Sequence, residues 1–203
     1  MRTSSESAPR GRRLPETLTG EEQRQLLMQP NPAAPTGLRN LCMMQLMLDA
    51  GLRTSEVLKL RVRDIDWMSG KLTVVRGKGD KDRVLWLNED ALDRLREWRE
   101  RRPEQPPKAS AEPGFLFTTL RGDPVRDNYY RKTVKRYAVK AGIFKDVHPH
   151  TLRHTFATDL YRETKNIRMV QKALGHADIS TTMLYTHIVD EDLEDAMRTF
   201  RRN

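Results

Sequence analysis

Residues 36–60 read TGLRNLCMMQLMLDAGLRTSEVLKL, and this stretch decides where the core of the chain lies. Apolar side chains fill most positions from Leu38 to Leu48, which is too dense a pattern for a helix that keeps one face in water. We therefore expect a buried central helix that runs to residue 50. Gly51 should end it, because glycine readily adopts the left-handed conformation that closes helices.

The residues around this helix predict further helices and one small sheet. The hydroxyl of Thr54 or Ser55 can cap a short helix, which places Arg53 at a helix N-terminus. Residues 64–87, DIDWMSGKLTVVRGKGDKDRVLWL, alternate apolar and polar side chains around two glycine-containing turns, as antiparallel strands do. Other helices are expected from Thr19, from Leu87, from Asp127 or Asn128, from Pro149 to about Glu163, from Ile167 to Gly175, over 178–188 and over 190–202. The predicted fold class is mainly α (α+β), a helical core with a small three-stranded antiparallel sheet.

The charge of the chain favours a polyanionic partner. Its 203 residues include 37 Lys and Arg against 28 Asp and Glu, a formal net charge of +9. Nucleic acid is the first expectation and an anionic membrane surface the second. One cysteine, Cys42, gives no disulfide framework, and no apolar run approaches the ~20 residues that span a bilayer. Without a signal-peptide pattern either, we expect a soluble, intracellular protein.

Residues 148–160, HPHTLRHTFATDL, gather three of the five histidines of the chain around an arginine. On a helix that begins at Pro149, the side chains of His150, Arg153 and His154 lie within one turn of one another. A metal could use the two histidines, but a fixed guanidinium beside a dication is electrostatically costly. A phosphate suits the set better, because an arginine offers two parallel donors that match phosphate oxygens.

Other side chains could complete a phosphoryl-transfer site. Arg53, at its helix N-terminus, could hold a second phosphate oxygen, and His176 could add another donor. Lys78, between two glycines, could protonate a leaving alkoxide. Tyr185 could attack phosphorus if nearby cations stabilise its phenolate. Taken singly, each of these residues is better explained as an ordinary surface or half-buried side chain, so the hypothesis depends on their combination.

Four motifs, in order and spacing, resemble the catalytic domain of the tyrosine recombinase family, which includes phage integrases, integron integrases and Xer recombinases. The motifs are AGLRTSEVLKLRVRDIDW, GKGDKDRVLWL, HPHTLRHTFAT and LGHADISTTMLYTH, and the resemblance spans roughly residues 14–189. It implies a catalytic set made of Arg53, Lys78, His150, Arg153, His176 and Tyr185. Glu56 matches an acidic position that supports such sites, and His154 matches a position that we interpret as structural support.

The resemblance implies a site-specific DNA recombinase, or integrase, that needs no cofactor and no metal. Tyr185 would attack a DNA phosphate and form a 3′-phosphotyrosyl bond, with Lys78 as the general acid. Both arginines and His176 would hold the non-bridging oxygens, while His150 assists proton transfer. Two successive strand exchanges would then pass through a Holliday junction.

The same resemblance gives expectations about domains and partners. Residues 1–13 would be a disordered basic tail or linker remnant, and 14–203 the catalytic domain, with the N-terminal core-binding domain of the family absent. The helix over 190–202 would dock onto a neighbouring protomer or onto its own domain. Expected partners are double-stranded DNA, further copies in a homotetramer on DNA (a monomer or weak oligomer when free) and accessory DNA-bending proteins. No membrane is expected, and the location would be cytoplasmic, at a prokaryotic nucleoid.

Two alternatives remain open at the level of sequence. A type IB topoisomerase shares the fold and the chemistry but relaxes supercoils, and a DNA-binding regulator could keep the fold without catalysis. The compact LGHADISTTMLYTH element favours the recombinase over the topoisomerase. The filled catalytic positions argue against the regulator.

Overall fold

The computed structural model describes residues 16–75, 82–103, 114–176, 182–183 and 185. Its elements, in chain order, are α1 (Gly20–Leu27), α2 (Pro35–Ala50), α3 (Thr54–Lys59), the 3-10 helix η1 (Val62–Asp64), β1 (Lys71–Val74), β2 (Arg83–Trp86), α4 (Glu89–Arg101), α5 (Asp127–Lys140), α6 (Pro149–Thr164) and α7 (Ile167–Leu174). The expected tail over 1–13 and the expected helices over 178–188 and 190–202 lie outside the described residues, apart from Thr182, Met183 and Tyr185.

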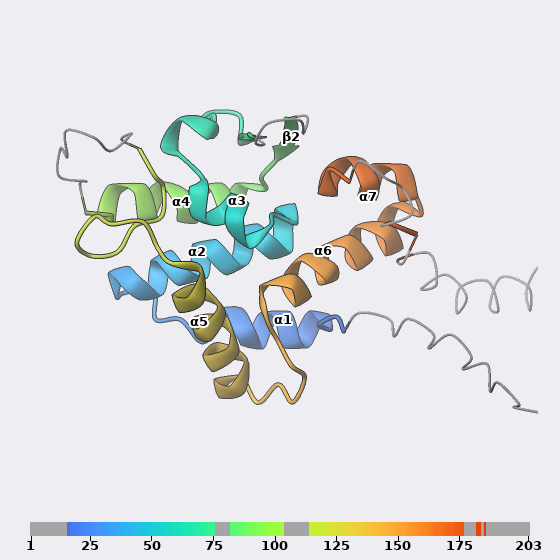
Figure 1. The fold of residues 1–203 in the computed structure, drawn as a ribbon, viewed down its shortest axis with the longest axis horizontal. Helices are drawn as coiled ribbons and strands as arrows, with labels where there is room; N and C mark the ends of the chain where they lie inside the picture. The colour runs from blue at the N-terminus through green and yellow to red at the C-terminus, as the bar shows by residue number, and fades with distance from the viewer. Residues whose placement is uncertain (1–15, 76–81, 104–113, 177–181, 184, 186–203) are drawn as a thin grey trace, which may run out of the picture.

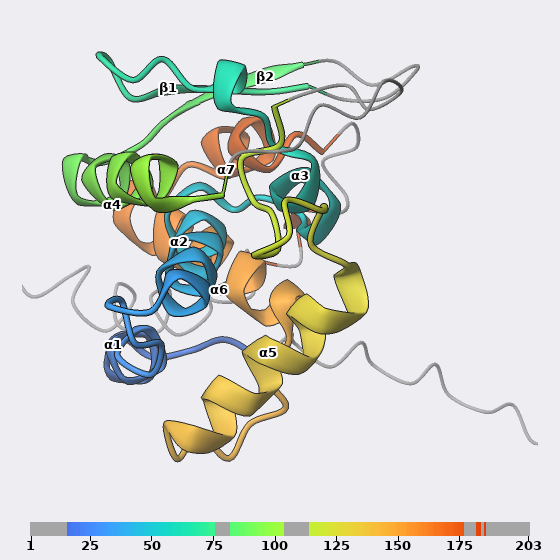
Figure 2. The same cartoon turned by 90° about the vertical axis from the view of Figure 1, so that its left-hand side faces the viewer.

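Helix α2 is the centre of the molecule, as its apolar density predicts. Met43 and Met44 are fully buried, and nearly every other residue of the helix is buried too. Helices α4 and α6 pack against it, and α2 lies between the sheet at one end of the molecule and α5 at the other (Figures 1 and 2). The predicted stop at Gly51 is confirmed, since this residue has φ 59° and ψ 31°.

The sheet is smaller than expected. Within the described residues it has two antiparallel strands, β1 and β2, with Lys71 opposite Trp86 and Val74 opposite Arg83. The expectation of three strands is therefore wrong. Residues 62–64 form a 3-10 turn, and Ile65 makes a single bridge to Leu72. Carboxylates of Asp64 and Asp66 accept nearby backbone N–H groups, and such local hydrogen bonds compete with a strand ladder.

Helices α6 and α7 follow each other in the chain and pack together, and α6 carries the histidine-rich stretch. Pro149 is the first residue of α6, and the ring of His148 caps the helix by accepting the Thr151 N–H at 3.3 Å. Lys165, at φ 51°, ends α6 and lets the chain turn back into α7, which ends at Gly175. Both predicted helices are confirmed.

Among the residues that the structure describes, no helix combines the length and the hydropathy needed to cross a bilayer.

Candidate active site

A buried carboxylate, Glu56, organises the start of α3. Its Oε2 accepts the backbone N–H of Arg53 at 2.7 Å, and its Oε1 accepts Nη1 of the same residue at 3.0 Å. Arg53 is thus the N-cap residue of α3, where the sequence pattern instead favours a hydroxyl of Thr54 or Ser55. The Arg53 side chain is about 35% exposed and that of Glu56 about 10%, so the Arg53 guanidinium reaches the surface while the carboxylate that holds it is largely buried.

Arg83, the first residue of β2, completes the coordination of Glu56. Its Nη1 and Nη2 donate to the two carboxylate oxygens at 2.8 Å each, the bidentate geometry that suits this pair. Burial alone would raise the pKa of Glu56, but hydrogen bonds and charge from Arg83 outweigh it and lower the pKa to about 2. Glu56 is therefore ionised at any physiological pH.

Arg153 lies behind these two arginines, on α6. Its Nη1 donates to the Gly51 carbonyl and lies 3.8 Å from Oε2 of Glu56, while Nη2 donates to the Leu174 carbonyl at 2.9 Å. Burial and the nearby charge of Arg53 lower the pKa of Arg153 to about 9, so the guanidinium stays charged at neutral pH. The end of α2 and the end of α7 thus hold a buried cation between them.

His176 extends this cluster beyond the end of α7. Its Nε2 lies 3.2 Å from Nη2 of Arg153, and its Nδ1 lies 3.0 Å from the Thr182 hydroxyl. Because Nη2 of an arginine can only donate, Nε2 of His176 accepts and Nδ1 carries the proton toward Thr182. The ring is fixed from both sides.

Tyr185 is buried, with 2% of its surface exposed, and packs among Ala157, Tyr161, Val170 and Leu174. Its hydroxyl lies 2.6 Å from Nδ1 of His154, on the same helix as Arg153. Burial raises the pKa of Tyr185 to about 12 despite the opposing charge of Arg153, and burial lowers the pKa of His154 to about 4. His154 therefore contacts the tyrosine directly, a closer relation than the structural support expected from the sequence.

His150 faces a different environment from His154. It lines a cavity of about 590 Å³ together with Arg53, Ser55 and Arg131. Burial and the neighbouring ring of His148, whose centroid is 6.0 Å away, lower its pKa. This imidazole is hence mostly neutral at neutral pH and can give or take a proton.

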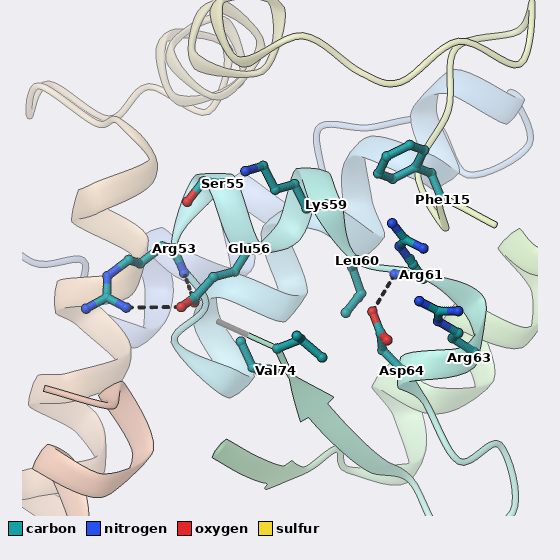
Figure 3. Close-up of a pocket in the computed structure, with 11 residues that line it drawn as sticks. Arg53, Ser55, Glu56, Lys59, Leu60, Arg61, Arg63, Asp64, Val74 and Phe115 are labelled. Carbon is teal, nitrogen blue, oxygen red and sulfur yellow. Dashed lines mark hydrogen bonds and ion pairs between the residues drawn. The ribbon is translucent and has the colours of Figure 1, made fainter. Parts of the chain in front are cut away.

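A second cavity, of about 700 Å³, extends from Arg53 along α3 and η1 (Figure 3). Arg53 lies at one end of it and Arg61 and Arg63 at the other, with Lys59 on α3 between them. The backbone N–H of Arg61 is held by Asp64 at 2.8 Å. The lining suits a chain of anions that passes beside Arg53.

The structure brings most of the sequence-predicted residues into one region. Contacts join Arg53, Glu56, Arg153 and His176, a cavity joins Arg53 to His150, and a hydrogen bond joins Tyr185 to His154. Lys78 lies outside the described residues. Arg83 was not among the predicted residues, although an arginine on the inward-facing side of an alternating strand is a signal that could have found it.

Comparison with known proteins places this arrangement in a family. The model of the phage integrase family matches residues 16–192. The chain is 41% identical over 182 residues to tyrosine recombinase XerD of Ralstonia nicotianae, covering 89% of this chain and 58% of that protein. It is 40% identical over 177 residues to tyrosine recombinase XerC of Xanthomonas axonopodis pv. citri, covering 87% and 55%.

Solved structures agree with these relatives. The XerA recombinase has 30% identity and a TM-score of 0.76 over 94% of this chain and 66% of its own. The XerH site-specific recombinase bound to a palindromic difH substrate has 31% identity and a TM-score of 0.78 over 97% and 56%. This chain spans less than two thirds of the length of the two curated relatives. By sequence and by fold, the chain belongs to the phage integrase family.

Proposed function

We propose that this chain is the catalytic domain of a site-specific tyrosine recombinase, which cuts and rejoins double-stranded DNA through a 3′-phosphotyrosyl intermediate. The observation that carries the proposal is the joining of Arg53, Arg153 and His176 into one contact network with Tyr185 on the neighbouring helix surface. The XerD, XerC and XerH relatives named above, of which XerH was solved with a DNA substrate, support it.

The cationic network suits the scissile phosphate. Two guanidiniums can each donate to one non-bridging oxygen, and charge on those oxygens increases as phosphorus becomes pentavalent. His176 would donate from Nε2 to the phosphate once that nitrogen carries a proton, either by exchange with Nδ1 or by protonation of the whole ring. His150, mostly neutral, would assist proton transfer at the scissile phosphate.

The nucleophile must change its surroundings before it reacts. Tyr185 is buried and its raised pKa disfavours the phenolate, so the bound DNA has to draw the hydroxyl toward the arginines. Tyr185 gives its phenol proton to the neutral imidazole of His150 as its oxygen bonds to phosphorus, and the bond to the 5′ oxygen breaks. In this scheme Lys78 gives its proton to the 5′ oxygen, a role carried over from the family motif.

Strand joining reverses the first step with a new partner. A free 5′-hydroxyl attacks the phosphotyrosine, the tyrosine oxygen regains a proton, and the energy of the phosphodiester bond is kept. Neither ATP nor a metal enters this scheme. Exchange of two strands by a protein tetramer, through a Holliday junction, is the further step that we propose for the assembled protein.

The domain assignments are also part of the proposal. In this proposal residues 14–203 form the catalytic domain, residues 1–13 serve as a basic tail or linker, and the segment 190–202 docks onto a neighbouring copy or onto its own domain.

Covalent trapping tests the proposal. On a nicked duplex whose cleaved end diffuses away, the wild-type chain should accumulate a protein–DNA adduct visible as a shifted band on a denaturing gel. Tyr185→Phe should form no adduct while its DNA affinity changes less than about threefold, because only the attacking oxygen is removed.

A matched control comes from the same apolar cluster. Tyr161 packs beside Tyr185 and is also buried, so Tyr161→Phe should keep adduct formation. Persistent adducts in Tyr185→Phe would show that another residue is the nucleophile. Relaxation of a supercoiled plasmid without any joining of two sites would favour a topoisomerase instead.

A further inference from the structure

We propose that Arg83 is a positioning residue of this site: through Glu56 and through the end of α7 it fixes where Arg53, Arg153 and His176 lie. The inference rests on the proposed recombinase function, because the three residues that it positions are those that would hold the scissile phosphate. Arg83 itself would not touch the DNA.

Arg83 makes a hydrogen bond from each of its three guanidinium nitrogens. Its guanidinium uses Nη1 and Nη2 for Glu56 at 2.8 Å each and Nε for the Ala173 carbonyl at 2.8 Å. The side chain is about 6% exposed. A buried, charged, three-point contact between β2, α3 and α7 defines one geometry, since a planar fork leaves little freedom.

Arg83 also limits how strongly Glu56 binds the other two arginines. Oε1 is shared between Arg83 and Arg53, and Oε2 lies 3.8 Å from Arg153. If Arg83 were removed, the carboxylate would lose its strongest partner and would bind the two remaining guanidiniums more tightly. It would then compete with the phosphate for them, because a carboxylate and a phosphate use the same donors.

The end of α7 is held by both Arg83 and Arg153. The adjacent carbonyls of Ala173 and Leu174 accept from Arg83 and from Arg153, at 2.8 and 2.9 Å. Carbonyls in the last turn of a helix lack helical partners and carry the negative end of its dipole, so both cations are favoured there. His176 follows two residues later, and its position therefore depends on how Arg83 holds this turn.

Arg83 also links this network to the β1–β2 connection. It pairs with Val74, the last residue of β1, and is the first residue of β2, the strand that follows 76–81 in the chain. Lys78, the residue assigned as the acid, belongs to that connection in sequence. One side chain thereby joins the strand that follows Lys78 to the helices that carry the arginines.

The test compares Arg83→Met and Arg83→Lys with wild type in single-turnover adduct formation across DNA concentrations. We expect the maximal rate of Arg83→Met to fall by about 100-fold, the effect of misplacing reacting groups by about 1 Å. The DNA concentration at half-maximal rate should change by less than about threefold, since surface cations dominate binding. Arg83→Lys, which keeps the charge and loses the fork, should recover part of the rate.

The control separates positioning from stability. Arg39 is 2% exposed and donates to the Thr118 carbonyl and the Tyr129 hydroxyl at 2.8 Å each, away from this site. Arg39→Met loses a comparably buried guanidinium. At a temperature where both variants are folded by circular dichroism, it should keep the wild-type rate.

A pH profile gives a second readout that a purely structural role would not move. Without Arg83, burial is less opposed and the pKa of Glu56 rises, so the carboxyl takes up a proton as pH decreases from 7 to 5. The neutral carboxyl competes less with the phosphate for Arg53 and Arg153, so the rate of Arg83→Met relative to that of Arg39→Met should rise over this range. Wild type should show no such acidic rise relative to Arg39→Met. Adding Glu56→Gln to Arg83→Met should remove it.

The outcomes distinguish this inference from the function on which it rests. If wild type forms adducts and Arg83→Met matches it in maximal rate and pH profile, the positioning role is wrong and the recombinase proposal stands. A loss in Arg83→Met no greater than that in Arg39→Met would equally overturn it. If wild type forms no adduct through Tyr185, the proposed function fails and the role of Arg83 fails with it.

Discussion

The hydrogen bond between His154 and Tyr185 joins a histidine that stays neutral to a tyrosine that would have to ionise in the proposed mechanism. Burial raises the pKa of the phenol to about 12 and lowers the pKa of the imidazole to about 4. Both groups are therefore uncharged at neutral pH in this structure, and the Tyr185 side chain is protected from solvent. A bound DNA phosphate would raise the pKa of His154, because its negative charge favours the protonated imidazole. In the proposed mechanism it would also bring the Tyr185 hydroxyl toward the arginines.

The lowered pKa of His154 predicts an acid-sensitive stability. The folded pKa of about 4 lies below the ordinary value of 6.5, so the unfolded chain binds the proton more readily. The neutral His154 therefore contributes to folding stability; this contribution is complete above pH 6.5 and is lost as pH falls toward 4. Between pH 7 and 4.5, the free energy of unfolding of wild type should decrease by on the order of 2 kcal/mol more than that of His154→Gln, whose side chain does not titrate.

Urea denaturation at the two pH values measures this difference. Carboxylates titrate in the same range, but they do so in both proteins and cancel in the comparison. Equal losses in wild type and His154→Gln would show that the imidazole is not held neutral in the folded protein.

Single residues mark the limit of what the sequence predicted about the site. Arg53 and Arg153 were found because their motifs carry them, and their chemistry suits a phosphate. The inward-facing position of Arg83 on its strand was a local signal that was missed, but nothing local shows that its partner is Glu56, which lies 27 positions earlier. The partner of Tyr185 could not be predicted either, because His154 and Tyr185 meet through the packing of α6.

At the scale of elements, Gly51 joins the core to the site. It ends α2 in the left-handed region, and its carbonyl accepts a hydrogen bond from Arg153 on α6. A Cβ at this position would lie 2.2 Å from Cδ1 of Phe156 and 3.1 Å from Cδ2 of Leu174. The residue is therefore required as glycine by its backbone conformation and by the close approach of α6 and α7.

Gly51→Ala should lower both stability and activity. The left-handed conformation costs roughly 1–2 kcal/mol for a residue with a Cβ, and the clash with Phe156 should add about 1–3 kcal/mol. Adduct formation should also slow, since the carbonyl that holds Arg153 has to shift. Thermal denaturation and the trapping assay measure the two effects.

Gly142→Ala provides the comparison, because Gly142 has φ 71° and a Cβ added there would meet nothing within 4 Å. It should show the backbone cost alone and keep the wild-type cleavage rate. If Gly51→Ala were no worse than Gly142→Ala in stability and rate, α6 would not pack on Gly51 as described.

Elements with strong local signals were predicted well. The capping box of Thr19 and Glu22, the proline that opens α6 and the glycines that end α2 and α7 determine helix ends through short-range chemistry. The prediction of a third strand was wrong although residues 64–67 do alternate in polarity. The carboxylates of Asp64 and Asp66 accept nearby backbone N–H groups, and these local hydrogen bonds replace those of a strand ladder. Periodicity alone does not report that competition.

At the scale of the whole molecule, positive charge faces the cavity beside Arg53. Lys59, Arg61 and Arg63 line it, and the chain carries a net charge of +9. If DNA phosphates follow this surface, affinity should decrease by roughly 10³-fold between 50 and 200 mM salt for about six phosphate contacts. Fluorescence anisotropy with a labelled duplex would measure the slope.

A single substitution tests where the phosphates lie. Arg63→Gln should reduce the salt slope by about 1, because one counterion-releasing contact is lost. Arg96→Gln, on α4 and paired with Asp93, should leave it unchanged. Equal slopes for Arg63→Gln and wild type would place the DNA elsewhere on the molecule.

The overall architecture was predictable because several independent motifs occur in one order, and order constrains topology more than any single motif does. The arrangement of α3, β2, α6 and α7 around Glu56 was not predictable from those motifs. It depends on long-range packing that has no local signature.

The arrangement at the end of α7 has a consequence for how the protein loses its structure. Adjacent carbonyls there are bound by arginines from β2 and from α6, so this turn cannot fray without releasing a buried cation from each. Amide hydrogens of the last turn should accordingly exchange only in large cooperative openings that also involve the core. Heat or denaturant should then inactivate the molecule and melt it at the same midpoint, with no partly folded, still competent species between.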